Sequence, residues 1–219
     1  MSTENARKPL IARLYHDYLD NQDAATFVGS LLRYYHAGTL ERLVAHEQAE
    51  VRRAAVFALG HTGEYVANHC LGRAMLDEDR TVRALAEVAI RKVWFRVGTD
   101  GQRRRLFLIA RLNAARQYRE AIRHARGLLD EAPHLAEPWN QRAVALFHLE
   151  KYAEAIRDCH EALEVNPYHF LAATTMGHAY MELDNYVSAL ECLRRALRLN
   201  PDLEGARMQV VRLARMVEE

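Results

Sequence analysis

The sequence predicts an all-α fold, a right-handed α-solenoid built from antiparallel helix pairs. In the C-terminal part, three columns of identical residues recur every 34 residues. They are Ala121, Ala155 and Ala189; Tyr118, Tyr152 and Tyr186; and Pro133, Pro167 and Pro201. A weaker pattern recurs every 31 residues upstream. Fixed periods of this length are typical of repeat arrays, in which each unit buries its apolar face by stacking on its neighbours.

The 34-residue period defines three units, residues 102–135, 136–169 and 170–203. Each unit contains two apolar-periodic stretches with a short break between them, so each is predicted to be a helix pair. Alanine suits the close approach of paired helices, and proline ends each unit because it cannot continue a helix. The predicted helices cover residues 136–148, 152–165, 170–182 and 186–199, with a capping helix at about 204–217.

The residues inside these units follow a known pattern. The middle unit has Trp139, Arg142-Ala143, Leu146, Ala155, Cys159, Ala162 and Pro167. The last has Met176-Gly177, Tyr180, Ala189, Leu193, Ala196 and Pro201, and the first has Leu108-Ile109, Leu112, Ala121, Ala125, Leu128 and Pro133. This array, about residues 102–217, resembles tetratricopeptide repeats. The resemblance implies that the first helix of each unit lines a concave groove.

The 31-residue pattern resembles a second repeat family. Val51-Arg52 recurs as Val82-Arg83, and Ala55, Ala58 and Leu59 recur as Ala86, Ala89 and Ile90. The pattern resembles the short bacterial form of HEAT repeats and implies helix pairs at about 38–61 and 64–97, with Arg52 and Arg83 in structural ion pairs. Two helices near residues 8–20 and 23–36 are predicted to cap this block.

The two patterns predict a HEAT-like block at residues 1–97 and a tetratricopeptide block at residues 102–219. The junction, Val97-Gly98-Thr99-Asp100-Gly101, is short enough to be a turn rather than a flexible tether. We therefore expect the HEAT-like repeats to stack on the three tetratricopeptide repeats as one curved solenoid.

Composition predicts a cytoplasmic protein without a membrane partner. No apolar run approaches the length of about 18 residues that spans a bilayer, and the N-terminus lacks the apolar region of a secretory signal. The three cysteines, Cys70, Cys159 and Cys192, form no disulfide framework, which indicates reduced thiols. Their apolar helix positions favour small buried side chains.

Motifs for catalysis or for cofactor binding are absent from the sequence. His148, His169 and His178 are predicted to approach one another on the inner surface, but no histidine has the tight ligand spacing of a zinc site. The sequence therefore predicts a non-enzymatic protein with no metal and no cofactor. One alternative is an accessory subunit of an enzyme, lyase-like or chaperone-like, because short HEAT repeats resemble those of phycobilin lyases.

The face of each first helix opposite its packing residues is predicted to form the groove. Its candidate residues are Leu106, Asn113, Asn140, Val144, Phe147, His148, Thr174, His178 and Met181. An ordinary solvated face is the alternative, but Leu106, Phe147 and Met181 are apolar where solubility alone would favour charge. The groove is therefore predicted to bind a peptide or a protein segment, so that the protein acts as a scaffold or adaptor.

The groove lacks one recognition device known in tetratricopeptide repeats. Arrays that grip the C-terminal carboxylate of heat-shock chaperones use Lys and Asn on the first inner helix, Asn on the second, and Lys and Arg on the third. The corresponding positions here are Leu106, Ala110, Gln141, Leu171 and Thr175. The resemblance therefore does not extend to this grip.

A basic belt is the second candidate site. Residues 80–126 carry 13 basic and 3 acidic side chains, although the whole chain has a net charge of only +1. The belt candidates are Arg103, Arg104, Arg105, Arg111, Arg116, Arg119 and Arg123. They predict an acidic protein partner or, as the alternative function, a nucleic acid or other anionic partner bound through residues 91–126. A structural alternative is that these arginines pair with acidic residues of both blocks.

Overall fold

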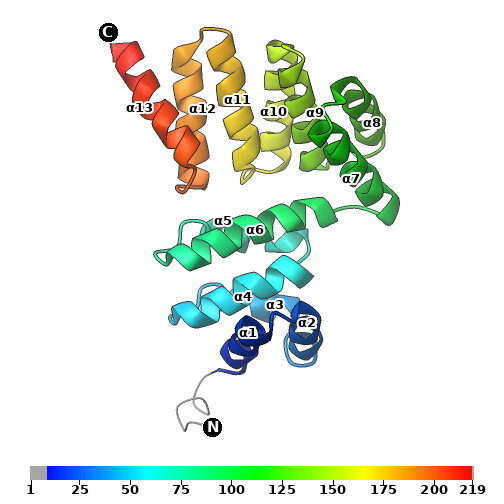
Figure 1. Cartoon of the computed structure of the whole chain (residues 1–219), viewed down its shortest axis with the longest axis vertical. Coiled ribbons are helices and arrows are strands. Elements are labelled where there is room, and N and C mark those ends of the chain that lie inside the picture. The colour runs from blue at the N-terminus through cyan, green and yellow to red at the C-terminus, as the bar shows by residue number, and fades with distance from the viewer. Residues whose placement is uncertain (1–8, 219) are drawn as a thin grey trace. The chain divides into compact units, whose positions relative to one another are not determined.

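The computed structural model describes residues 9–218, and this part of the chain is helical with no β-strand (Figure 1). The predicted all-α solenoid of helix pairs is thereby confirmed. The chain separates into two compact units, one that runs to Val93 and one that begins at Trp94. No helix in the described part is both long and apolar enough to cross a membrane.

The first unit contains α1 (Leu10–Asn21), α2 (Ala24–Leu32), α3 (Ala37–Leu43), α4 (Ala49–Thr62), α5 (Asn68–Ala74) and most of α6 (Arg80–Arg96). The predicted start of the first helix at residue 8 lies outside the described residues. The second helix was predicted to reach residue 36, but α2 ends at Leu32 because the chain turns there to begin α3.

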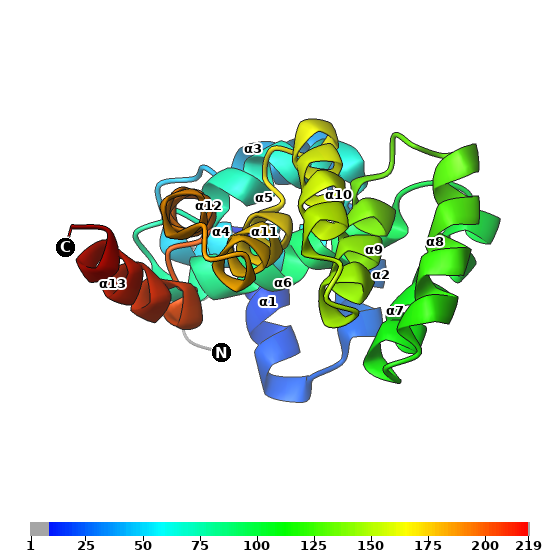
Figure 2. The same cartoon turned by 90° about the horizontal axis from the view of Figure 1, so that it is seen from above.

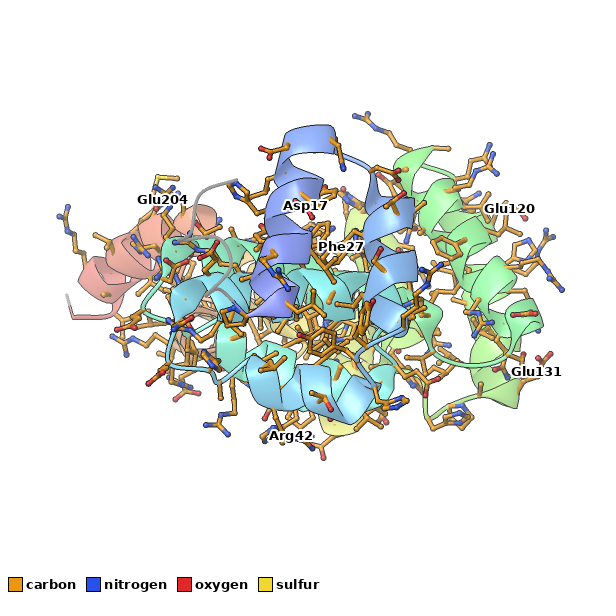
Figure 3. The ribbon with its side chains drawn as sticks, turned by 90° about the horizontal axis from the view of Figure 1, so that it is seen from below. Asp17, Phe27, Arg42, Glu120, Glu131 and Glu204 are labelled. Atoms are coloured by element: carbon orange, nitrogen blue, oxygen red, sulfur yellow. The ribbon has the colours of Figure 1, made fainter. Side chains whose placement is uncertain are left out.

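Aromatic rings hold α1, α2 and α4 together. Phe27 of α2 is buried, and Figure 3 shows it pointing from α2 toward α1. Its ring centroid lies 5.9 Å from that of Tyr18 and 5.2 Å from that of Phe57, and Tyr18 and Phe57 are 4.3 Å apart. The rings therefore supply much of the apolar contact among these helices.

Two arginines repeat one structural role across the 31-residue period. Arg52 is buried and donates to both carboxylate oxygens of Asp77, at 2.8 Å each, and to the carbonyl oxygens of His46 and Glu47. Arg83 donates to the carbonyl oxygens of Asp77 and Glu78, which occupy the corresponding positions one repeat later. Both arginines thus tie a helix to the turn that precedes it. The predicted ion pair is present for Arg52, with Asp77, and the contacts described for Arg83 are with backbone oxygens.

The second unit consists of helix pairs in sequence order, shown from above in Figure 2. After the last turn of α6 it contains α7 (Asp100–Ala114), α8 (Tyr118–Glu131), α9 (Ala136–His148), α10 (Tyr152–Val165), α11 (Phe170–Glu182), α12 (Tyr186–Leu199) and α13 (Glu204–Glu218). The predicted bounds of α9 to α12 are confirmed residue for residue. The final helix, α13, occupies the predicted capping position.

The last turn of α6 contributes two aromatic residues to the second unit. The Trp94 ring stacks on His169, with the centroids 4.2 Å apart, and Phe95 lies 5.3 Å from Phe107. These contacts explain why the second unit begins before the Gly98 turn. Thr99 then starts α7 with a capping box that it forms with Gln102.

Small residues set the spacing within each pair. Ala121, Ala155 and Ala189 are fully buried, as the 34-residue period predicts. Gly177 on α11 is equally restrictive, because a Cβ atom there would lie only 2.7 Å from Cγ of Leu193 on α12. Helices that pack this closely leave no room for a larger side chain at the contact.

The turn within each pair contains one residue with a left-handed backbone. Arg116, Glu150 and Asp184 have φ values of 58°, 61° and 55°, and they are spaced by the 34-residue period. Each follows the end of the first helix, where glycine is usual because other side chains are strained in this conformation.

Candidate protein-binding site

The first helices of the repeats form one layer of the second unit. α7 contacts α9, and α9 contacts α11, whereas the second helices α8, α10 and α12 make few direct contacts with one another. A row of pairs with closely spaced first helices curves toward those helices. The exposed side of α7, α9 and α11 is called the inner face below.

An aromatic cluster occupies the inner face at the C-terminal ends of α9 and α11. Phe147 is half-buried, and its ring centroid lies 5.6 Å from that of His148 and 6.4 Å from that of His178. Tyr152 lies 5.5 Å from Phe147, and Tyr118 stacks on His148 at 4.7 Å. The structure therefore brings together Phe147, His148 and His178, three of the candidates.

The electrostatic state of this cluster follows from burial. Burial lowers the pKa of His178, although a hydrogen bond with Gln209 of α13 and the charge of Glu182 act in the opposite direction. With its pKa below the ordinary value, the His178 imidazole is uncharged at neutral pH. Phe147 and His178 thus present two uncharged rings on the inner face.

Val144, Thr174, Met181 and Asn113 are also partly exposed on the first helices. The Thr174 hydroxyl donates to the Phe170 carbonyl oxygen within its own helix. The Asn113 amide of α7 donates to both the backbone and the side-chain oxygen of Gln141 on α9, at 2.9 Å each. Asn113 therefore links two repeats while part of its side chain stays exposed.

Two candidates do not lie on an exposed surface. Leu106 is only 1% exposed and packs with Ile109, Ala121 and Ala125 in the core between α7 and α8. Asn140 is 2% exposed, and its amide donates to the Glu137 carboxylate at 3.3 Å. The predictions of Leu106 and Asn140 as groove residues are wrong, because the core in one case and a buried acid in the other draw the side chain inward.

Glu137 belongs to a network of buried, hydrogen-bonded side chains that was not predicted from the sequence. Glu137 accepts from Nε2 of Gln141 at 2.7 Å, and its second oxygen lies 2.9 Å from Nε2 of His169. His169 Nδ1 accepts from the backbone N–H of Ala172 at 3.2 Å, which caps α11. This acceptor role at Nδ1 places the proton on Nε2, so that the ring donates to Glu137.

The predicted meeting of His169 with His148 and His178 on the inner surface is therefore wrong. His169 is fully buried, and it replaces the leucines found at the corresponding positions 135 and 203. The sequence signal that could have identified this pair is a histidine in a leucine column, in the same unit as Glu137, which is the only acid in its own column. In the described part of the chain, no three His, Cys, Asp or Glu side chains are arranged to hold a metal ion.

The basic-belt residues fall into two groups. Arg103 donates to the carbonyl oxygens of Arg96 and Gly98 and pairs with Asp100, so it closes the junction turn. Arg105 pairs with Glu131 at 2.6 Å, and Arg123 pairs with Glu120. Figure 3 shows Glu120 and Glu131 at the surface of α8. These three arginines have local structural partners within the second unit.

The remaining four belt arginines are exposed and form no ion pair within residues 9–218. They are Arg104, Arg111, Arg116 and Arg119. Arg104 and Arg111 are seven residues apart on α7 and so lie on nearly the same side of this helix. Arg116 and Arg119 lie at the adjoining turn and at the start of α8.

A family model, "Tetratricopeptide repeat", matches residues 136–169 and 172–203. These residues are tetratricopeptide repeats, as predicted for the middle and last units. A search of curated proteins finds no significant match to this sequence.

Solved structures of tetratricopeptide domains share the fold. The first such domain of Spaghetti (RPAP3), bound to the HSP90 peptide SRMEEVD, is 24% identical, with a TM-score of 0.53 over 56% of this chain and 98% of that one. The Arabidopsis OM64 domain is 22% identical, with a TM-score of 0.51 over 52% and 95%. The TPR2B domain of yeast Sti1, in a complex labelled pHsp70, is 21% identical, with a TM-score of 0.50 over 54% and 99%.

Proposed function

We propose that this protein is a non-enzymatic interaction module that holds a segment of a partner protein on the inner face of its tetratricopeptide repeats. The observation that carries the proposal is the aromatic cluster around Phe147, which stays partly exposed where a purely solvated surface would be charged. Aromatic side chains in such positions are typical anchors of protein interfaces.

The chemistry of the inner face supports a partner segment with an apolar side chain. Phe147, Val144 and Met181 offer apolar contact, and His178 is uncharged at neutral pH because burial lowers its pKa. The Spaghetti domain is described with an HSP90 peptide. Here the positions that would grip a terminal carboxylate hold Leu106, Ala110, Gln141, Leu171 and Thr175. An internal, apolar-anchored segment suits this chain better.

The test selects peptides from a random display library on the full-length protein. Phe147→Ala should weaken the selected peptides by at least about 1 kcal/mol, or roughly fivefold, because it removes the anchor. Val187→Ala is the control, since Val187 is an exposed apolar residue on the second helix α12. Circular dichroism checks that both variants remain folded. Selected peptides that bind Phe147→Ala as tightly as the native protein would contradict the proposal.

A second candidate function is binding of a polyanion through Arg104, Arg111, Arg116 and Arg119. The absence of ion pairs at these four exposed side chains, within the described residues, favours it. Arg104→Glu/Arg111→Glu should lower the salt dependence of single-stranded RNA binding by about 0.7 in log–log slope for each lost phosphate contact. Arg13→Glu/Arg33→Glu, with the same change of charge, is the control. If the salt dependence of RNA binding has the same log–log slope in both variants, this function is excluded.

For the first unit, we propose a HEAT-like repeat pair with a structural role. The matching contacts of Arg52 and Arg83 with consecutive turns support this assignment. Three free thiols, at Cys70, Cys159 and Cys192, support a reducing, cytoplasmic location.

A further inference from the structure

The second helices of the array enclose two grooves that occupy equivalent places in successive repeats. One lies between α8 and α10 and is small, about 160 Å³, with Arg142, Leu146 and Asp158 in its lining. The other lies between α10 and α12 and is open, about 520 Å³, with Met176, Tyr180 and Cys192 in the same three positions one period later. Both lie on the side of the second helices, away from the inner face.

An ion pair crosses the smaller groove and has no equivalent in the larger one. The Arg142 guanidinium donates to both oxygens of the Asp158 carboxylate, at 2.6 and 2.7 Å, and spans the smaller groove. Met176 and Cys192 replace this pair in the next repeat and cannot bridge α11 and α12 in the same way. The larger groove therefore has an apolar floor of Met176 and Cys192, both nearly buried, and the half-buried Tyr180 ring beside them.

Helix α12 also differs from α10 in charge. The α10 positions 160, 161 and 164 hold His, Glu and Glu, and the corresponding α12 positions hold Arg194, Arg195 and Arg198. All three arginines line the open groove, together with His160 and a single acid, Glu191. None of the three forms an ion pair or a side-chain hydrogen bond with any residue that the structure describes. Three unpaired guanidinium groups beside an apolar floor are complementary to carboxylates that flank an apolar side chain.

We propose that this outer groove, between α10 and α12, binds an acidic segment of a partner protein. Carboxylates of the segment would pair with Arg194, Arg195 and Arg198, and one apolar side chain would lie on Met176 and Tyr180. The site is separate from the inner face, so it does not depend on the function proposed for that surface. Nucleic acid fits less well, because the lining holds only two aromatic rings, Tyr180 and His160, and successive bases need several rings on which to stack.

The test measures fluorescence anisotropy of a labelled peptide of glutamates interrupted by single leucines, added to the full-length protein. A peptide with glutamine in place of every glutamate is the neutral reference, and a single-stranded oligonucleotide of thymidines is the nucleic-acid probe. The acidic peptide should bind, and both other probes should bind at least about tenfold more weakly, since each charge-assisted hydrogen bond contributes more than a neutral one.

Variants copied from the preceding repeat locate the binding. Arg195→Glu/Arg198→Glu restores the residue types of positions 161 and 164 and should weaken the acidic peptide by about tenfold or more. Ser188→Glu restores the type of Glu154, places a carboxylate within the groove and should also weaken binding. Arg212→Glu/Arg215→Glu makes the same change of charge on exposed residues of α13 and should leave the affinity nearly unchanged.

The affected side chains lie at the surface or only partly below it, so these variants are expected to fold, which circular dichroism checks. The proposal is overturned if the α13 control weakens the peptide as much as the groove variant does. It is also overturned if the oligonucleotide binds as tightly as the acidic peptide, or if the groove variants bind the peptide normally.

Discussion

The second and third tetratricopeptide repeats have the same helix lengths and the same turns, yet they fill the space between their helices with different chemistry. In the second repeat, Arg142 and Asp158 form a largely buried ion pair, with side chains 18% and 7% exposed. The third has Met176 and Cys192 in these places. The small residues at the close helix contacts, Ala155 and Ala189, stay constant across the period, whereas the residues of this pair change together.

A second pair of positions shows the same coupling. Gly177 on α11 faces Leu193 on α12, and the equivalent positions one period earlier hold Ala143 on α9 and the smaller Cys159 on α10, both buried in one cluster. In each repeat one side chain of this pair is small enough for the other to fit, but the two helices divide the side-chain volume differently. This comparison indicates that a residue pair of one repeat can be replaced by the equivalent pair of the other, provided that both residues are exchanged together.

The largest effect is expected from breaking the ion pair. Asp158→Ala should destabilise the second unit by about 3–5 kcal/mol, because it leaves the Arg142 guanidinium buried without its partner. Cys192→Ala, the equivalent change in the third repeat, should cost only about 1 kcal/mol. Denaturant unfolding followed by tryptophan fluorescence measures both, since the two tryptophans, Trp94 and Trp139, lie in this unit.

The matched control exchanges both partners. Arg142→Met/Asp158→Cys copies the third repeat and should recover most of the lost stability, because an apolar pair often replaces a buried ion pair at little cost. If Asp158→Ala costs no more than Cys192→Ala, the ion pair does not distinguish the two repeats energetically.

The next effect concerns the helix contact at Gly177. Gly177→Ala should cost about 1–3 kcal/mol, because its new methyl group overlaps Leu193. Adding Leu193→Cys recreates the residue pair of the second repeat and should restore part of the loss. A double-mutant cycle from unfolding data measures this coupling, and purely additive costs would show that the two positions are independent.

A smaller effect is expected at the turns. Glu150→Gly should stabilise the protein by about 0.5–1 kcal/mol, because glycine adopts the left-handed conformation without strain. Asp184→Gly should gain less, since Asp tolerates this conformation better than Glu. Thermal unfolding compares the two variants. A loss of stability in Glu150→Gly would mean that its side chain contributes more than the turn strain costs.

The smallest effect is expected at His178, whose equivalent in the second repeat is Val144. Because burial holds its pKa below the usual 6.5, the unfolded chain takes up a proton first as the pH falls. The stability contribution is therefore complete above pH 6.5 and decreases as the pH drops toward the folded-state pKa. His178→Val should reduce this acid dependence, which unfolding curves across that range measure. The same dependence in both proteins would assign it to other groups.

The sequence predicted the tetratricopeptide helices well because three residue columns restrict their register. Ala155, Tyr152 and Pro167 each mark a position within the repeat, so the helix bounds follow with little freedom. The first unit is harder, because only the Val-Arg columns recur. Nothing in the sequence around Leu32 indicates that α2 ends there, since this end depends on where α3 must begin.

The binding surfaces were predicted less completely than the helices. Spacing assigned Asn140 to the inner face, but the buried pair of Glu137 and His169 draws its amide inward. Leu106 faces the core because α8 covers it. The outer groove was not predicted, because the 34-residue period was used only to find residues that the repeats share. The groove is instead indicated by residues that differ between the repeats, namely Arg142 and Asp158 in the second and Met176 and Cys192 in the third.

The burial of the thiols has a practical consequence. Burial raises the pKa of Cys192 to about 11 and also raises that of Cys159, which lies in the core of the second repeat. Only a thiolate reacts readily with alkylating reagents, so both thiols react slowly in the folded protein. Cys159 is fully buried, and its modification must await a local opening, whereas Cys192 is 7% exposed on the floor of the open groove. The rate at which Cys159 gains the mass of such a reagent therefore reports how often α10 separates from its neighbours. Mass spectrometry of the native protein can measure this rate with no substitution at all.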